Sequence, residues 1–175
     1  PVIIDGGKVV HDSSAIADYL EERYADRPSL FPGASARPLT KFVQNWTETV
    51  LQVGLIRLVL LDIYKHIGPT DQAYFRQSRE SRFGTTLEEV VEDREVRLPA
   101  FRASLDPLRR TVERQAFLCG DAPAYADYIV FGAFQWARSI SEFESLASDD
   151  PIYAWRGRML DLYGGLGRKS PGYGG

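Results

Sequence analysis

The stretch that decides the fold opens the chain, where residues 1–20 are PVIIDGGKVVHDSSAIADYL. Two short apolar runs, Val2 to Ile4 and Lys8 to Val10, have high strand propensity and flank Asp5-Gly6-Gly7, whose glycines tolerate positive φ. This pattern predicts a β-hairpin. After the hairpin, the four-residue spacing of apolar side chains predicts a helix from Ala15 to Tyr24, with Ser13 as its N-cap.

The hairpin implies a larger sheet, because a two-stranded ribbon is only marginally stable by itself. Pro1 leads straight into the apolar run and the single methionine is Met159, so no Met start or polar lead-in precedes the first strand. We therefore expect the sequence to begin inside a domain.

A linker and a helical region follow the first helix. Residues 25–38 contain three prolines and a glycine between them, which is typical of a linker. After Leu39 no alternating strand pattern occurs. A first long helix is expected to reach about Ile67 and to stop at Gly68-Pro69.

Local signals divide the rest of this region. Thr85 and Glu88 have capping-box spacing, which predicts a helix start. The stretch from Ala126 to Ala137 is apolar nearly all round, which is typical of a helix in the middle of a bundle. Asp150 and Pro151 predict the start of a last helix, Gly164-Gly165 its end, and an irregular tail from Leu166 to Gly175.

Composition excludes several classes of protein. With 175 residues, 44% of them hydrophobic, the chain can bury a substantial core. A net charge of −3 gives no general reason to expect nucleic acid or an anionic membrane as a partner, and no apolar run approaches the ~18 residues of a membrane span. One cysteine excludes an internal disulfide and is compatible with a reducing compartment.

Few residues offer chemistry, and each has a structural alternative. The two histidines and Cys119 lack the spacing of a zinc site, so no metal is expected. Ser13 at a helix start is either an ordinary N-cap or, through its N–H and hydroxyl, a site for a carboxylate or phosphate. Trp46 and Tyr64 line an apolar ligand pocket or belong to the core. Cys119 follows two apolar residues, which favours a buried, inert thiol.

Taken in order, these features resemble a cytosolic glutathione S-transferase. The likeness rests on a Pro before an apolar strand, a Gly turn, a second strand, an acidic-Ser pair opening the helix body at residues 15–20, a Pro-rich linker and a helical domain. It implies that Pro1 is the family's cis-proline and that Asp12 and Ser13 bind the γ-glutamyl end of glutathione.

Two further motifs agree with this likeness. Residues 120–127, GDAPAYAD, resemble the buried capping box before the family's central helix, in which Asp127 reaches back to the helix start. Ala124 replaces the usual Ser or Thr cap, a loss worth about 1 kcal/mol. Residues 74–80, 82–88 and 165–169 resemble fungal and bacterial glutathione transferases related to the lignin β-etherases.

The resemblance implies a mainly α fold. Residues 1–25 form the last ββα part of a thioredoxin-like glutathione-binding domain, residues 26–38 are the linker, and residues 39–175 form the all-helical C-terminal domain. It also implies a cytoplasmic homodimer with a role in detoxification.

The implied activity is glutathione transfer. The thiolate of glutathione, the cosubstrate, is added to a hydrophobic aromatic electrophile, with aryl-ether cleavage as one form of the reaction, and Trp46, Val50 and Tyr64 are the candidates for the substrate pocket. The etherase-like members are expected to use a catalytic Ser, which lies upstream of Pro1. Two alternatives stay open: a non-catalytic, ligandin-like module that binds aromatic small molecules, and an interaction domain that only dimerises.

The first prediction follows from the expected position of the catalytic residue. The 175 residues alone should not conjugate glutathione at an enzymatic rate, because they lack the group that stabilises the thiolate. A standard thiol-conjugation assay on the purified 175-residue chain measures this rate, and robust turnover would contradict the prediction.

Overall fold

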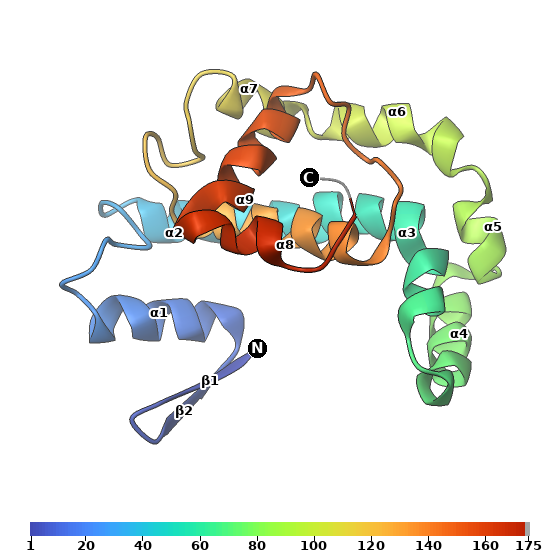
Figure 1. Ribbon diagram of the computed structural model, residues 1–175, viewed down its shortest axis with the longest axis horizontal. Coiled ribbons are helices and arrows are strands. Elements are labelled where there is room, and N and C mark those ends of the chain that lie inside the picture. Colours follow the sequence, from blue (N-terminus) through green and yellow to red (C-terminus); the bar gives the residue numbers. More distant parts are fainter. Residues whose placement is uncertain (174–175) are drawn as a thin grey trace.

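The computed structural model describes residues 1–173 and consists mainly of helices (Figure 1). An N-terminal unit lies at one end, built from strand β1 (Val2–Asp5), strand β2 (Lys8–His11) and helix α1 (Ser13–Arg23). All the other helices lie together on one side of this unit. The mainly α fold with a small two-stranded sheet is as predicted.

The hairpin is confirmed. β1 and β2 are antiparallel, with Ile3 opposite Val10 and Asp5 opposite Lys8. The connecting residues Gly6 and Gly7 have φ of 55° and 85°, the sign that a tight two-residue hairpin turn requires at both positions.

The sheet has one covered and one open face. Ile3 and Val10 are half-buried, and both strands contact α1. Asp5 accepts hydrogen bonds from the hydroxyls of Tyr19 and Tyr24, both at 2.9 Å, which ties the end of β1 to α1. On the other face the apolar side chains of every second residue are exposed, namely Val2, Ile4 and Val9.

The first helix begins differently from the prediction. Its N-cap is Asp12, and Ser13 is the first helical residue. The Asp12 carboxylate accepts from the amides of Ser14 and Ala15, so it satisfies two donors that the first turn leaves unpaired. The prediction that Ser13 is the N-cap is therefore wrong, because the carboxylate one residue earlier takes that role.

The linker is held near its middle, at Leu30 and Phe31. The Glu21 carboxylate on α1 accepts from the amide of Leu30 at 2.8 Å, and the Leu30 carbonyl accepts from the amide of Tyr125 at 2.9 Å. The Phe31 ring packs edge-on against the Tyr125 ring, with centroids 5.5 Å apart. The linker thus connects α1 to the start of a central helix.

The remaining elements are helical. They are α2 (Ala36–Trp46), the π-helical turn η1 (Thr47–Leu51), α3 (Gln52–His66), α4 (Pro69–Phe83), α5 (Leu87–Glu92), α6 (Arg94–Ser104), α7 (Asp106–Val112), α8 (Tyr125–Ile140) and α9 (Pro151–Lys169). The predicted first long helix corresponds to α2, η1 and α3, and its stop before Pro69 is confirmed. It starts three residues earlier than Leu39 and contains the π-helical turn.

Helices α3 and α8 form the centre of the core. α8 contacts α2, η1, α3 and α9, as its apolar surface predicts. Phe134 of α8 packs edge-on against Trp155 of α9, with ring centroids 6.4 Å apart. Gly54 allows α6 to approach α3, since a Cβ at this position would lie 2.4 Å from the Phe101 ring. Trp136 is the exception on α8, because its side chain is partly exposed.

The capping box before α5 lies one residue later than predicted. Thr86 and Glu89 exchange the two hydrogen bonds, and Glu88 instead accepts from the Arg76 guanidinium at 2.8 and 2.9 Å. This placement lets Leu87 and Val90 face α3, where both are buried.

The last helix starts as predicted and ends differently. The Asp150 carboxylate caps it by accepting from the amide of Ile152 at 2.8 Å. The backbone breaks at residues 162–165, where Gly164 and Gly165 have positive φ. Helix resumes as far as Lys169, so the prediction of an irregular segment from Leu166 is wrong for these residues. Residues 174 and 175 lie outside the described part of the chain.

Asp127 is the most buried carboxylate of the described residues and has no exposed surface. Its Oδ1 accepts from the Leu118 amide at 2.8 Å and from the Trp155 indole Nε1 at 3.0 Å. Its Oδ2 accepts from the Ala124 amide at 3.1 Å, which is the reciprocal half of the predicted capping box. The other half is missing, because Ala124 has no side-chain oxygen.

In the part of the chain that the structure describes, none of the helices has both the length and the apolar character that crossing a membrane requires.

We predict that Asp127 is a major determinant of stability. Asp127→Ala leaves three buried donors without an acceptor and should lower the free energy of unfolding by about 3 kcal/mol or more. Urea unfolding of the variant and the parent chain measures this difference. Asp121→Asn changes an exposed carboxylate six residues earlier and is the control, with an expected change within about 0.5 kcal/mol. Equal losses in the two variants would contradict the role given to Asp127.

Candidate functional site

The structure brings Pro1, Asp12 and Ser13 together at one end of the N-terminal unit. The hairpin register places Val2 opposite His11, so both strand ends meet there. The amide of Asp12 donates to the carbonyl of Pro1 at 3.3 Å. The three residues predicted to bind one ligand are therefore neighbours around the start of α1.

Asp12 holds its carboxylate in a fixed position. Oδ1 accepts from Ser14 N at 2.9 Å and from Ala15 N at 3.1 Å, while Oδ2 has no partner within residues 1–173. The φ of Asp12 is 74°, in a region that residues other than glycine seldom adopt. The hydrogen bond from the Ala15 amide lowers the pKa of this carboxyl, and the amide of Ser14 and the positive charge of Lys41 act in the same direction. At neutral pH Asp12 is therefore an anion whose Oδ2 has no partner among the described residues.

Ser13 presents donors next to this anion. The residue is exposed, and neither its amide nor its hydroxyl has a partner among the described residues. It is the first residue of an 11-residue helix, where unpaired amides and the helix dipole favour negative charge. Ser13 offers hydrogen-bond donors to the carboxylate of a ligand, and Asp12 offers an acceptor to an ammonium group. An α-amino acid group, which carries both charges on one carbon, fits this arrangement.

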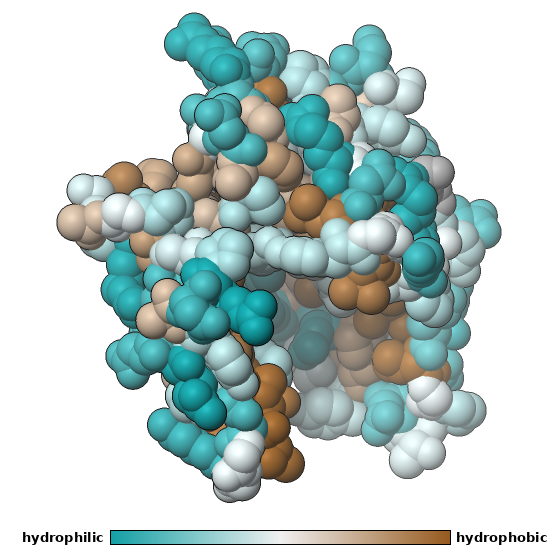
Figure 2. All heavy atoms as spheres, turned by 60° about the vertical axis from the view of Figure 1, so that its left-hand side comes forward, coloured by the Kyte–Doolittle hydropathy of each residue, from teal (hydrophilic) through white to brown (hydrophobic). Residues whose placement is uncertain are grey.

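The site continues onto the helical part along one face of α2. The Ser14 hydroxyl is 3.1 Å from Oε1 of Gln44, and Gln44 donates to Glu48 at 2.8 Å. Beyond Glu48, a pocket of about 300 Å³ lies between α3 and α8, lined in part by Ile56 and Trp136. Figure 2 shows the surface hollowed between the N-terminal unit and the helices.

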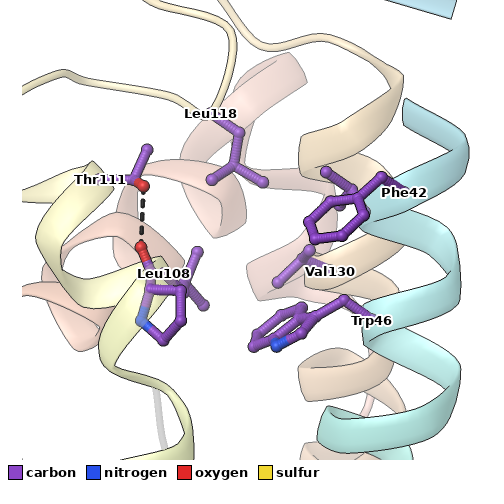
Figure 3. Close-up of a pocket in the computed structure, with 8 residues that line it drawn as sticks. Phe42, Trp46, Leu108, Thr111, Leu118 and Val130 are labelled. Carbon is purple, nitrogen blue, oxygen red and sulfur yellow. Dashed lines mark hydrogen bonds between the residues drawn. The ribbon is translucent and has the colours of Figure 1, made fainter. Parts of the chain in front are cut away.

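The three residues proposed for the substrate pocket lie apart. Trp46 lines an apolar cavity between α2 and α7 (Figure 3). Val50 is half-buried in η1, and Tyr64 packs near the far end of α3 against Phe75, beneath the Arg76 guanidinium. Neither Val50 nor Tyr64 is among the eight described residues that line the Trp46 cavity.

Sequence reasoning missed most of the cavity around Trp46. Its other walls include Phe42 of α2, Leu108 of α7, Leu118 of the following loop and Val130 of α8. The sequence contains one local signal, since Leu39, Phe42, Val43 and Trp46 follow the spacing of one helical face. The opposing walls come from distant segments, and no local pattern indicates that they meet α2.

Cys119 is exposed, so the prediction of a buried thiol is wrong. The residue lies in the loop before α8, beside a groove bordered by the linker and α2. Partial burial of its sulfur raises the pKa of the thiol, and the charge of Asp127 adds to this effect. The protonated thiol is a poor nucleophile, so nothing assigns Cys119 to catalysis.

Family models match both parts of the chain. The model "Glutathione S-transferase, C-terminal domain" matches residues 38–163, and the model "Glutathione S-transferase, N-terminal domain" matches residues 1–28. The boundary between the two matches lies in the linker.

Solved structures of fungal glutathione transferases are similar to this chain. GSTFuA3 from Phanerochaete chrysosporium shares 30% identity, with a TM-score of 0.69 over 94% of this chain and 64% of its own. A glutathione S-transferase of Ceriporiopsis subvermispora, solved in complex with glutathione, shares 25% identity, with a TM-score of 0.67 over 94% of this chain and 66% of its own. The chain thus spans slightly less than two thirds of the length of these relatives.

We predict a measurable consequence of the lowered pKa of Asp12. Folding favours the ionised carboxylate, so its contribution to stability is present above the ordinary pKa of 3.8 and is lost as pH falls through the lower value of the folded state. An NMR titration of the Asp12 carboxyl carbon should give a pKa below 3.8. Asp12→Asn is the control, whose stability should fall less steeply in acid. A measured pKa at or above 3.8 would show that the amides of Ser14 and Ala15 do not stabilise the ionised carboxylate of Asp12.

Proposed function

The chain belongs to the glutathione S-transferase family, and from this premise we propose that it binds glutathione at the start of α1. The observation that supports the proposal is that, among the described residues, the amide and hydroxyl of Ser13 and the neighbouring Oδ2 of Asp12 have no partner. The γ-glutamyl end of glutathione has one carboxylate and one ammonium group on the same carbon. Ser13 would hold the carboxylate, and Asp12 Oδ2 would accept from the ammonium.

In this proposal Pro1 positions Asp12. Its carbonyl accepts from the amide of Asp12, which helps to hold Asp12 in its unusual backbone conformation. An ordered first turn leaves less conformational freedom to be lost when the ligand binds.

The proposed reaction is thiolate transfer to an electrophilic aromatic substrate. The thiol gives its proton to solvent water, the sulfur forms a bond to the electrophilic carbon, and the group displaced there leaves with its bonding electrons. With an aryl ether the leaving group is a phenoxide. A hydrogen bond to the thiolate lowers the pKa of the thiol, and we assign this role to a serine hydroxyl, as the resemblance to the β-etherase-like proteins implies.

The aromatic substrate would lie in the pocket between α3 and α8. This pocket follows Gln44 and Glu48 along the helix, on the side that faces the N-terminal unit, and Trp136 offers an exposed ring for stacking. The family resemblance supports proposing a homodimer in the cytoplasm as the working form of the protein.

We predict that Ser13→Ala weakens glutathione binding by about tenfold or more, because one hydrogen bond to a charged group contributes about 1.5–3 kcal/mol. Titration calorimetry with glutathione measures this change on the chain as it stands. Ser14→Ala is the matched control, because the Ser14 hydroxyl is directed to Gln44 and not to the ligand.

A second ligand sharpens the test. The dipeptide Cys-Gly lacks the γ-glutamyl end and should bind too weakly to be measured at the same site. Equal affinities of the Ser13→Ala and Ser14→Ala variants for glutathione, or equal affinities of the parent chain for glutathione and Cys-Gly, would rule out this binding mode.

A further inference from the structure

Arg156 in the first half of α9 is a buried cation that the proposed function does not use. The residue is 7% exposed, and its guanidinium lies over the Tyr153 ring, with Cζ 4.6 Å from the ring centroid. Its Nε is enclosed and finds no hydrogen-bond partner among residues 1–173. Within the same residues the whole guanidinium forms neither a hydrogen bond nor an ion pair, and the Tyr153 ring is the group that it contacts.

Two comparable arginines are paired. Arg138 of α8, which is 8% exposed, donates to the Ser170 carbonyl at 3.3 Å. Arg109 of α7 donates to the Asp150 carboxylate at 2.9 and 3.1 Å. A charge that is removed from water without an acceptor or a counter-charge is strongly unfavourable. A ligand that brings negative charge to Arg156 would therefore be stabilised there.

The surroundings of Arg156 are positive. Helix α9 carries four cationic side chains and one carboxylate, namely Arg156, Arg158, Arg168, Lys169 and Asp161. The whole chain, in contrast, has a net charge of −3. Asp161 raises the pKa of Arg168 and Tyr153 adds to this rise, so a second guanidinium lies near the ring on which Arg156 stacks. Two cations near one ring make the local potential more positive, which attracts an anion.

The accessible part of the guanidinium fits an oxyanion. The Tyr153 ring covers one of its faces. Because Nε is enclosed, a ligand reaches the group through the two terminal nitrogens. The N–H groups of these nitrogens lie in one plane and match two oxygen atoms that are bonded to the same carbon or phosphorus atom.

We propose that Arg156 is the centre of a binding site for the carboxylate or phosphate group of a small molecule, which the guanidinium holds while the Tyr153 ring supports it from one face. The site uses no residue of the N-terminal unit and none of the pocket between α3 and α8. It therefore goes beyond the proposed transferase function and does not depend on it.

Urea unfolding of the whole chain with and without an anion tests the proposal. Sodium phosphate or sodium acetate replaces sodium chloride at constant ionic strength, so that the screening of charges stays equal. At least one of the two anions should raise the urea midpoint, and the rise should grow with the logarithm of the anion concentration above the Kd. The anion that gives the larger rise identifies phosphate or carboxylate as the preferred group.

Variants locate the site. Arg156→Met should remove the response to the anion, because it keeps an apolar side chain over Tyr153 and lacks the donors. Lys169→Met is the matched control, since it removes one positive charge from an exposed position on the same helix and should respond as the parent chain does. Arg156→Lys keeps the charge without the planar fork and should bind the anion at least about tenfold more weakly.

A second measurement separates this site from Ser13, which is itself proposed to hold a carboxylate. The Nε–H signal of Arg156 in NMR spectra should shift with phosphate or acetate. Ser13→Ala should leave this shift unchanged while it weakens glutathione binding. A failure of the present proposal is thereby distinguished from a failure of the proposed function.

Three results would overturn the proposal. One is a urea midpoint of the parent chain that neither phosphate nor acetate raises above its value in chloride. Another is an equal response of the parent chain and Arg156→Met, which would place the anion elsewhere and leave Arg156 with stacking on Tyr153 alone. The third is an Arg156 Nε–H signal that stays in place while the anion stabilises the chain.

Discussion

The buried carboxylate of Asp127 is the interaction on which the helical part depends. It accepts hydrogen bonds from the Leu118 amide in the loop before α8, from the amide of Ala124, the N-cap residue of α8, and from the Trp155 indole of α9. A buried carboxylate with three donors favours this arrangement of the segments, because a shift of any one of them leaves a buried donor without its acceptor. The carboxylate thus fixes where α8 begins, and α8 in turn supports α2, α3 and α9.

Helix α2 has a polar face and an apolar face. Its polar face contacts the N-terminal unit, where Ser14 meets Gln44 and Arg37 pairs with Asp18. Its apolar face borders the cavity closed by α7 and α8. One face of α2 is therefore polar and borders the proposed glutathione site, and the other face is apolar and borders the helical core.

The features that depend on a few neighbouring residues could be predicted from the sequence. The predictions failed where contacts between distant segments determine the structure. The Gly6-Gly7 turn, the stop before Pro69 and the cap at Asp150 each depend on a few neighbouring residues, and all three are present. The caps of α1 and α5 are each displaced by one residue. At α1, Asp12 and Ser13 are adjacent and have similar capping ability, so the sequence does not decide between them. At α5, the burial of Leu87 and Val90 determines where the helix starts. Asp12 and Ser13 could be proposed from their motif, and the structure places them side by side. The cavity at Trp46 could not be predicted, because it depends on α7 packing across from α2.

The most direct test of this account is an amide NMR titration of the whole chain with glutathione. We expect glutathione to shift the amide signals of Ser13 and its neighbours in α1 and to leave the Trp46 indole signal in place. Glutathione shifts centred on α2 and α7, with the Ser13 amide signal unchanged, would contradict the central claim that glutathione binds at the start of α1.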